Sequence, residues 1–184
     1  MFGINRKEEA SLYYLYMMAD GNVTEKEKKI FNSICKELDV DKDEKKEVIK
    51  KCKGLVNGSD KILSILVNEK LDEQVGHGIF GLQNASSLAR IIWNLVNLGY
   101  ADSFYSEEEK GIVNYLVDKW SVSLDVYQEF VDTADTILAL TKQKEWLIVT
   151  FQKDQVRDKK ERDINSKIKR LLEDVKLTIE EITM

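Results

Sequence analysis

Four acidic residues form the pattern in this sequence that is best suited to chemistry. Asp20 and Glu27 lie seven positions apart, and Asp102 and Glu109 repeat that spacing 82 positions further along the chain. Carboxylate oxygens are the ligands that hard divalent cations such as Ca²⁺, Mg²⁺ and Mn²⁺ prefer. The four acids are therefore candidate metal ligands, and a divalent cation is the candidate cofactor.

Helix capping gives the same residues a purely structural role. Thr24 and Ser106 stand three residues before Glu27 and Glu109, which is the spacing of a capping box. A single motif also supplies too few oxygens for Ca²⁺, which takes about six to eight. The sequence leaves two interpretations open, cation binding or capping alone.

The other reactive side chains do not assemble into an active site. His77, the one histidine, lies in Gly-His-Gly-Ile-Phe-Gly at 76–81, which matches the dinucleotide pattern G-x-G-x-x-G but follows no buried strand. We interpret this segment as a hinge. Cys35 and Cys52 fall on apolar helical faces without C-x-x-C spacing. We therefore expect no enzymatic activity and no catalytic residues.

The two acidic patterns belong to a longer internal repeat. Residues 19–31 and 101–113 are identical at six of thirteen positions, and a similar ladder of apolar residues follows each segment. Each copy has the pattern of one helix ending, a short turn and a second helix beginning. The sequence predicts two helix-turn-helix units, 12–38 and 94–120, related by approximate two-fold symmetry.

The first copy resembles a known family. An apolar helix that ends in Ala-Asp-Gly at 19–21, followed by Thr-Glu-x-Glu at 24–27, is similar to the TerB-like group of tellurite-resistance proteins and the related N-terminal domain of the DjlA co-chaperone. The resemblance covers roughly residues 5–140 and is weaker in the second copy, where Ser103 replaces glycine. It implies an all-helical fold built on a duplicated acidic helix pair, and a link to metal or oxyanion stress. The ion or ligand contacts that it implies are Asp20, Glu27, Asp102 and Glu109.

Composition favours an all-α protein. The chain of 184 residues contains no proline, 43% hydrophobic residues and 33% charged residues, and long helices suit that balance because proline is the strongest interior helix breaker. The net charge of −5 disfavours a nucleic-acid partner. No run approaches the ~20 apolar residues that a membrane span requires. We expect a cytoplasmic protein with no membrane span and no nucleic-acid partner.

Periodic apolar residues predict the order of the helices. A single helix is expected at 60–71, and an apolar helix from residue 84 onward is expected to be the central element. The other predicted helices cover 6–19, 25–38, 42–53, 107–120 and a segment that begins near 124.

The C-terminal part differs in character, which suggests a division into residues 1–142, the TerB-like domain, and 143–184, a helical extension. Residues 146–151 are rich in β-branched and aromatic residues, but we interpret them as the buried part of a helix because no partner strand exists. An apolar stripe from Ile164 to Ile182 has heptad spacing. This amphipathic helix either packs back on the core or binds a protein partner, and self-association as a homo-oligomer is a third alternative.

The sequence thus predicts a non-enzymatic binding or adaptor module of the TerB-like, stress-response type. It would contact a protein partner through its C-terminal helix and hold an ion among the paired acids. The alternative is a structural or assembly protein that acts through the C-terminal helix, with the acids serving only as caps.

Overall fold

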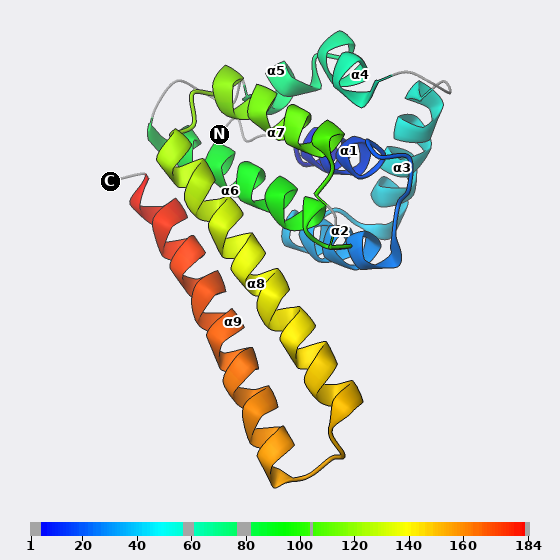
Figure 1. Cartoon of the computed structure of the whole chain (residues 1–184). Helices are drawn as coiled ribbons and strands as arrows, with labels where there is room; N and C mark the ends of the chain where they lie inside the picture. Colours follow the sequence, from blue (N-terminus) through cyan, green and yellow to red (C-terminus); the bar gives the residue numbers. More distant parts are fainter. Residues whose placement is uncertain (1–4, 57–60, 77–81, 104, 183–184) are drawn as a thin grey trace.

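The computed structural model describes residues 5–56, 61–76, 82–103 and 105–182, and within these ranges it contains α-helices and no strand. The all-α prediction is confirmed. The helices are α1 (Arg6–Met17), α2 (Glu25–Glu37), α3 (Lys42–Leu55), α4 (Ile62–Asn68), α5 (Leu71–Gly76), α6 (Leu82–Gly99), α7 (Glu107–Lys119), α8 (Leu124–Thr150) and α9 (Gln155–Glu181) (Figure 1). None of these helices is long and apolar enough to cross a membrane.

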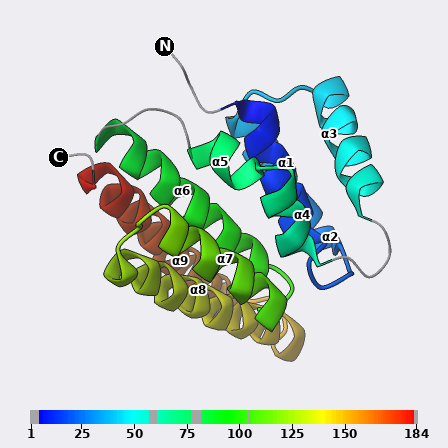
Figure 2. The same ribbon diagram turned by 90° about the horizontal axis from the view of Figure 1, so that it is seen from above.

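The helices form one bundle from which a long hairpin extends. Seen from above, α1 to α5 make one side of the bundle and α6 to α9 the other (Figure 2). Helix α1 contacts α2, α3, α4, α5 and α6, while α6 contacts α7, α8 and α9. The lower half of the α8–α9 hairpin projects beyond the other helices (Figure 1).

The core is centred on α1 and α6. Leu12, Leu15 and Tyr16 of α1 are fully buried, as are Ile91 and Leu95 of α6. Helix α1 is buried along both of its faces because α3 covers one side and α5 and α6 cover the other. The expectation that the helix following residue 84 is central was correct, but α1 shares this role.

A buried polar network joins α1 to α6. Glu9 accepts hydrogen bonds from both terminal nitrogens of Arg90 at 2.8 and 3.0 Å, and from the Tyr13 hydroxyl at 2.8 Å. Asn94 in turn donates to the Tyr13 hydroxyl at 3.0 Å. Glu9 is almost completely buried. The network therefore compensates a buried carboxylate and fixes the two central helices in register.

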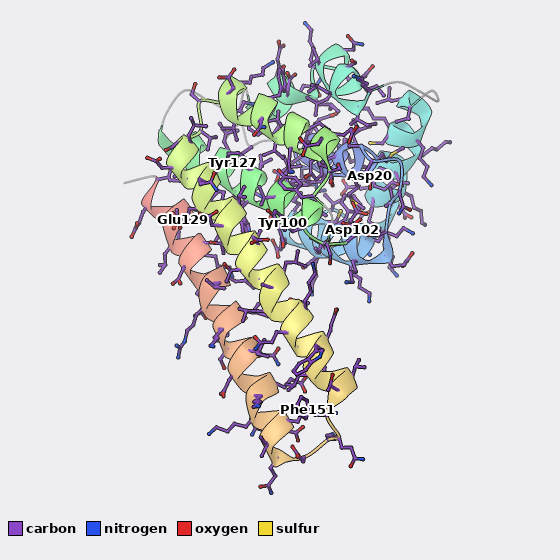
Figure 3. All side chains as sticks on the ribbon, viewed as in Figure 1. Asp20, Tyr100, Asp102, Tyr127, Glu129 and Phe151 are labelled. Atoms are coloured by element: carbon purple, nitrogen blue, oxygen red, sulfur yellow. The ribbon has the colours of Figure 1, made fainter. Side chains whose placement is uncertain are left out.

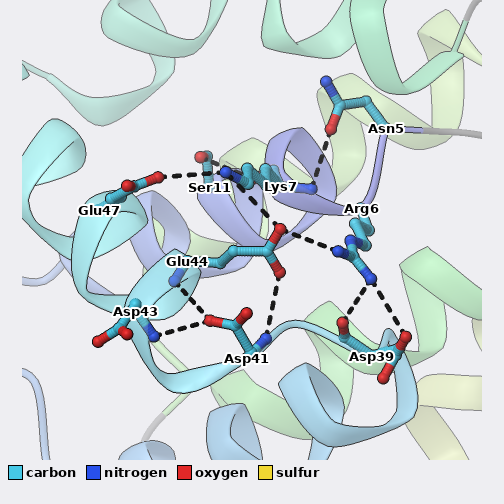
Figure 4. Close-up of polar contacts among 9 residues, drawn as sticks. All are labelled: Asn5, Arg6, Lys7, Ser11, Asp39, Asp41, Asp43, Glu44 and Glu47. Atoms are coloured by element: carbon cyan, nitrogen blue, oxygen red, sulfur yellow. Dashed lines mark hydrogen bonds and ion pairs between the residues drawn. The ribbon is translucent and has the colours of Figure 1, made fainter.

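Charged side chains link the outer surface of α1 to α3 (Figure 4). Arg6 donates to Asp39 at 3.2 Å and to Glu44 at 2.9 Å, and Lys7 pairs with Glu47 at 3.1 Å. These pairs are at the surface, where each contributes little to stability. The acids Glu44 and Glu47 of α3 thus pair with the basic start of α1.

The helix predicted at 60–71 is α4, but it ends at Asn68, and a second short helix, α5, begins at Leu71. Lys70 adopts a left-handed conformation, with φ of 53°, between α4 and α5. The break brings Asp72 beneath α7, where its carboxylate accepts hydrogen bonds from Tyr115 and Lys119 and its carbonyl accepts one from Trp120. Of the predicted hinge at 76–81, Gly76 ends α5, and residues 77–81, with His77, lie outside the described residues.

The C-terminal helix packs back on the bundle. Ile164 and Val175, two residues of the predicted stripe, are buried, and α9 contacts α8 and α6. Of the alternatives for the stripe, the structure shows packing on the core. Helix α8 continues without interruption across residues 142 and 143, the proposed domain boundary.

Residues 146–151 form the end of a helix as expected, but the prediction that they are buried is wrong. Leu147 is buried, whereas Trp146, Ile148, Val149 and Phe151 are exposed. The reason is that the hairpin extends past the bundle, so α9 covers only one side of α8 there (Figure 1).

Candidate functional site: two acidic turns

The first acidic turn connects α1 to α2. Gly21 adopts φ of 81°, a left-handed conformation that glycine reaches without strain. The Asp20 carboxylate accepts a hydrogen bond from the Asn22 backbone at 2.8 Å, which stabilises the turn. Thr24 then caps α2, accepting from the Glu27 backbone at 3.2 Å while the Glu27 carboxylate accepts from the Thr24 backbone at 2.7 Å.

The second turn, between α6 and α7, has the same local construction. Ser103 corresponds to Gly21 and has φ of 77°. The left-handed conformation is therefore kept, although the Cβ atom of serine makes it sterically unfavourable. The Ser106 hydroxyl accepts from the Glu109 backbone at 3.2 Å and donates to the Glu109 carboxylate at 2.9 Å. The Ser106 backbone also donates to that carboxylate at 2.8 Å.

The same offset of 82 residues extends to the far ends of α2 and α7. Asp39 and Ser121 both adopt left-handed conformations, with φ of 56° and 53°. The next residue in each copy donates to a carbonyl five residues back, Val40 to Cys35 at 2.8 Å and Val122 to Val117 at 3.0 Å. The local backbone is thus similar at corresponding positions of the two units. The internal duplication and a two-fold axis relating the two units stay predictions.

The two capping glutamates are buried at their helix starts. Burial raises the pKa of Glu27, the Thr24 hydrogen bonds lower it, and the carboxylates of Asp20 and Asp102 raise it again. For Glu109 the same causes act, burial first, then the opposing bonds from Ser106, then the charges of Asp20 and Glu27, and the pKa rises to about 7. Glu109 therefore changes charge near neutral pH.

These mutual effects place the four predicted acids in one electrostatic cluster. Asp20 acts on both glutamates, Asp102 acts on Glu27, and Glu27 acts on Glu109. Asp20 and Asp102 lie on the same part of the bundle, at the ends of α1 and α6 (Figure 3). Asp20 is exposed and Asp102 is half-buried. Whether the four acids bind an ion stays a prediction.

The capping interpretation is confirmed for both glutamates, since both capping boxes are complete. A preformed metal centre is a different matter. Within the described residues, no group of three or more His, Cys, Asp or Glu side chains is arranged to hold a metal ion. One oxygen of each glutamate is already occupied by backbone donors. The acids therefore do not fit a cation stripped of its water.

Two tyrosines near Glu109, the buried Tyr16 and the half-buried Tyr105, escaped the sequence analysis. The hydroxyls of Tyr16 and Tyr105 are buried without a hydrogen-bond partner among the described residues, and burial raises the pKa of both. The negative charge of Glu109 raises these pKa values further. Gly99 makes room for the pair, because a Cβ atom there would lie 2.5 Å from the Tyr16 hydroxyl. No spacing in the sequence links these three residues.

A cleft of about 840 Å³ opens beside the first turn. Asp20 and Gly21 line one side, Lys61 and Leu63 of the α4 region line another, and the first turn of α7 closes it with Glu108. Solvent-exposed Asp20 thus sits at a concave surface that a ligand can enter.

The two cysteines take no part in this site. Cys35 and Cys52 are buried, and burial raises the pKa of each thiol to about 11. A thiol with that pKa is protonated at neutral pH and is a poor nucleophile.

Comparisons of this chain with protein-family models, with curated proteins and with solved structures found no match. The resemblance to the TerB-like group therefore rests on the residues of the two turns alone.

Proposed function

We propose that this protein is a non-enzymatic helical binding module of the TerB-like, stress-response type, with the paired acidic turns as its ligand-responsive face. The observation that supports the proposal is that acids from two separate turns lie together: Asp20 and Asp102 lie on the same part of the bundle (Figure 3), and their charges raise the pKa of Glu27. Helix capping requires only one acid at each helix start. It does not explain why the acids of the two turns lie close enough for their charges to interact.

A divalent cation is the ligand that such a cluster favours. Carboxylates that lie close together repel one another, and a bound cation reduces this repulsion. Because the glutamates keep their caps, the cation proposed here retains most of its water shell. Mg²⁺ dehydrates reluctantly and commonly binds through one or two carboxylates, so it suits this cluster better than Ca²⁺.

Several features argue against an enzyme at this site. A carboxyl group with a pKa of about 7 suits general acid-base chemistry, and Glu109 has that property. However, Glu109 is buried, and its carboxylate accepts two hydrogen bonds, one from the Ser106 backbone and one from the Ser106 hydroxyl. A substrate would have to displace this cap to reach the carboxylate.

The alternative function is a structural or assembly role, with the acids as caps only. Complete capping boxes in both turns favour it. Under this alternative, contacts with a protein partner would come from the C-terminal hairpin.

Thermal unfolding with Mg²⁺, Ca²⁺ or Mn²⁺ separates the two functions. A cation that binds only the folded protein raises its melting temperature by mass action. We expect this rise in the wild type and its loss in the double variant Asp20→Asn/Asp102→Asn. The matched control Glu47→Gln/Glu173→Gln removes two exposed acids elsewhere and should keep the rise. If the melting temperature is unaffected by millimolar cation, the acids are caps and the structural alternative holds.

A further inference from the structure

The apex of the α8–α9 hairpin concentrates exposed apolar surface. Of the nine large hydrophobic side chains that are exposed among the described residues, five lie within 146–156. Val149 is 86% exposed, Val156 63% and Trp146 58%. We call Trp146, Ile148, Val149, Phe151 and Val156 the apical patch. Surface of this kind usually marks an interaction site.

The apical patch surrounds the end of α8. Successive residues of an α-helix are about 100° apart, so Trp146 and Ile148 lie on either side of Leu147 and Val149 lies roughly opposite it. Leu147 is the residue that packs inward. A folded partner protein covers one side of a helix, whereas the interfacial region of a lipid bilayer surrounds an inserted end on every side.

Charge around the apical patch is opposite in sign to the rest of the chain. Residues 142–162 contain seven Lys or Arg and four Asp or Glu, a net charge of +3, while the whole chain carries −5 and the remainder therefore −8. Two of the four acids are already paired, Glu145 with Lys26 at 3.8 Å and Glu161 with Lys144 at 3.6 Å. A negatively charged surface would attract the apex and repel the body.

The aromatic residues of the apex have the chemistry of a membrane interface. The rings of Trp146 and Phe151 pack edge to face with centroids 5.4 Å apart (Phe151 is labelled in Figure 3). The Lys160 ammonium lies 5.9 Å from the centre of the Phe151 ring. Trp prefers the headgroup level of a bilayer, and lysine extends its charge toward headgroups while its stem stays in apolar surroundings.

We propose that the apex of the α8–α9 hairpin binds the surface of an anionic lipid bilayer. The apical patch enters the headgroup region, Lys153, Lys159 and Lys160 contact lipid phosphates, and the acidic body stays in water. The hairpin does not span the bilayer. This inference goes beyond the proposed function and does not depend on the acidic turns.

Vesicle binding tests the proposal directly. The full chain is mixed with vesicles of equimolar phosphatidylglycerol and phosphatidylcholine, and with vesicles of phosphatidylcholine alone. We expect co-sedimentation with the anionic vesicles and a blue shift of tryptophan emission. The variant Trp146→Phe should bind and lose the shift, which identifies Trp146 as the reporter. The double variant Asp20→Asn/Asp102→Asn should bind as the wild type does.

Paired variants separate the contributions of apolar surface and charge. Val149→Asp should weaken vesicle binding by about tenfold or more, because a valine leaves the interface and a negative charge enters it. Leu124→Asp is the matched control, because Leu124 is 72% exposed at the opposite end of the same helix, and its binding should not change. Lys159→Gln/Lys160→Gln should weaken binding by roughly 25-fold, since each positive charge contributes about fivefold.

Two results would overturn the proposal. The first is no binding to anionic vesicles, and the second is binding to anionic vesicles that Val149→Asp leaves unchanged. If the protein does not bind vesicles but self-associates, and Val149→Asp abolishes that self-association, a second copy of the chain is the occupant of the apex.

Discussion

Replacing Glu109 by glutamine should change how stability depends on pH. Glu109 has a pKa of about 7 in the folded protein, against an ordinary value of 4.5. Below pH 4.5 the Glu109 carboxyl group is protonated in both the folded and the unfolded protein. Above about pH 7 it is ionised in both, and the folded protein must hold a buried charge. Stability therefore falls as pH rises between these values, and the full loss from Glu109 corresponds to about 3 kcal/mol.

Glutamine keeps the shape of the side chain and accepts the bonds from Ser106, but it cannot ionise. The stability of Glu109→Gln relative to the wild type should thus increase by up to about 3 kcal/mol between about pH 5 and about pH 8. Urea unfolding at the two pH values measures this difference. Other carboxyl groups, such as Asp41 and Glu44, contribute equally to the stability of the variant and of the wild type, so their contributions cancel in the difference. Backbone hydrogen bonds lower the pKa values of these two groups, which therefore titrate at more acidic pH.

Glu107→Gln is the control, because Glu107 is an exposed acid in the same helical turn and pairs with Lys110 at 2.7 Å. Its stability relative to the wild type should not vary across this pH range. If Glu109→Gln follows the pH dependence of the wild type, burial and neighbouring acids do not control this carboxyl group and the reasoning is refuted.

Further predictions concern caps, the buried network and the hairpin. Thr24→Ala and Ser106→Ala should each lower the free energy of unfolding by about 1 kcal/mol with or without cation, measured by urea unfolding. Arg90→Leu should cost about 3–5 kcal/mol because it leaves Glu9 buried without its counter-charge, and a loss below about 1 kcal/mol would show that the pair is unimportant. Gly99→Ala should cost about 1–3 kcal/mol by crowding Tyr16, as thermal unfolding will show. Truncation after Gln152 removes the α9 packing of Ile164 and Val175 and should lower the melting temperature; an unchanged value would mean that α9 is separable.

The local structure of the turns was predictable because its causes are local. A capping box involves residues three positions apart, so Thr24 with Glu27 and Ser106 with Glu109 predicted both helix starts. Apolar periodicity likewise located α6. The break at Lys70 was not predictable, because apolar residues continue on both sides of it. The break is stabilised by tertiary hydrogen bonds, since it places the Asp72 carboxylate where Tyr115 of α7 donates to it.

Features that depend on contacts between distant parts of the chain could not be predicted from the sequence. Tyr16 and Tyr105 meet only because Gly99 leaves space between them. The exposure of Trp146 and Val149 also could not be foreseen, since a β-branched and aromatic run is normally buried. How far a hairpin extends beyond its bundle depends on helix lengths and packing, which spacing alone does not specify.

The coupling between the two turns is the central claim, and a carbon NMR titration of the Glu109 side-chain carboxyl tests it most directly. We predict a pKa of about 7 in the wild type and a lower value in Asp20→Asn, because Asp20 lies in the other turn and its charge raises the pKa of Glu109. A Glu109 pKa that is the same in Asp20→Asn as in the wild type, or one near the ordinary value of 4.5 in the wild type, would contradict the account.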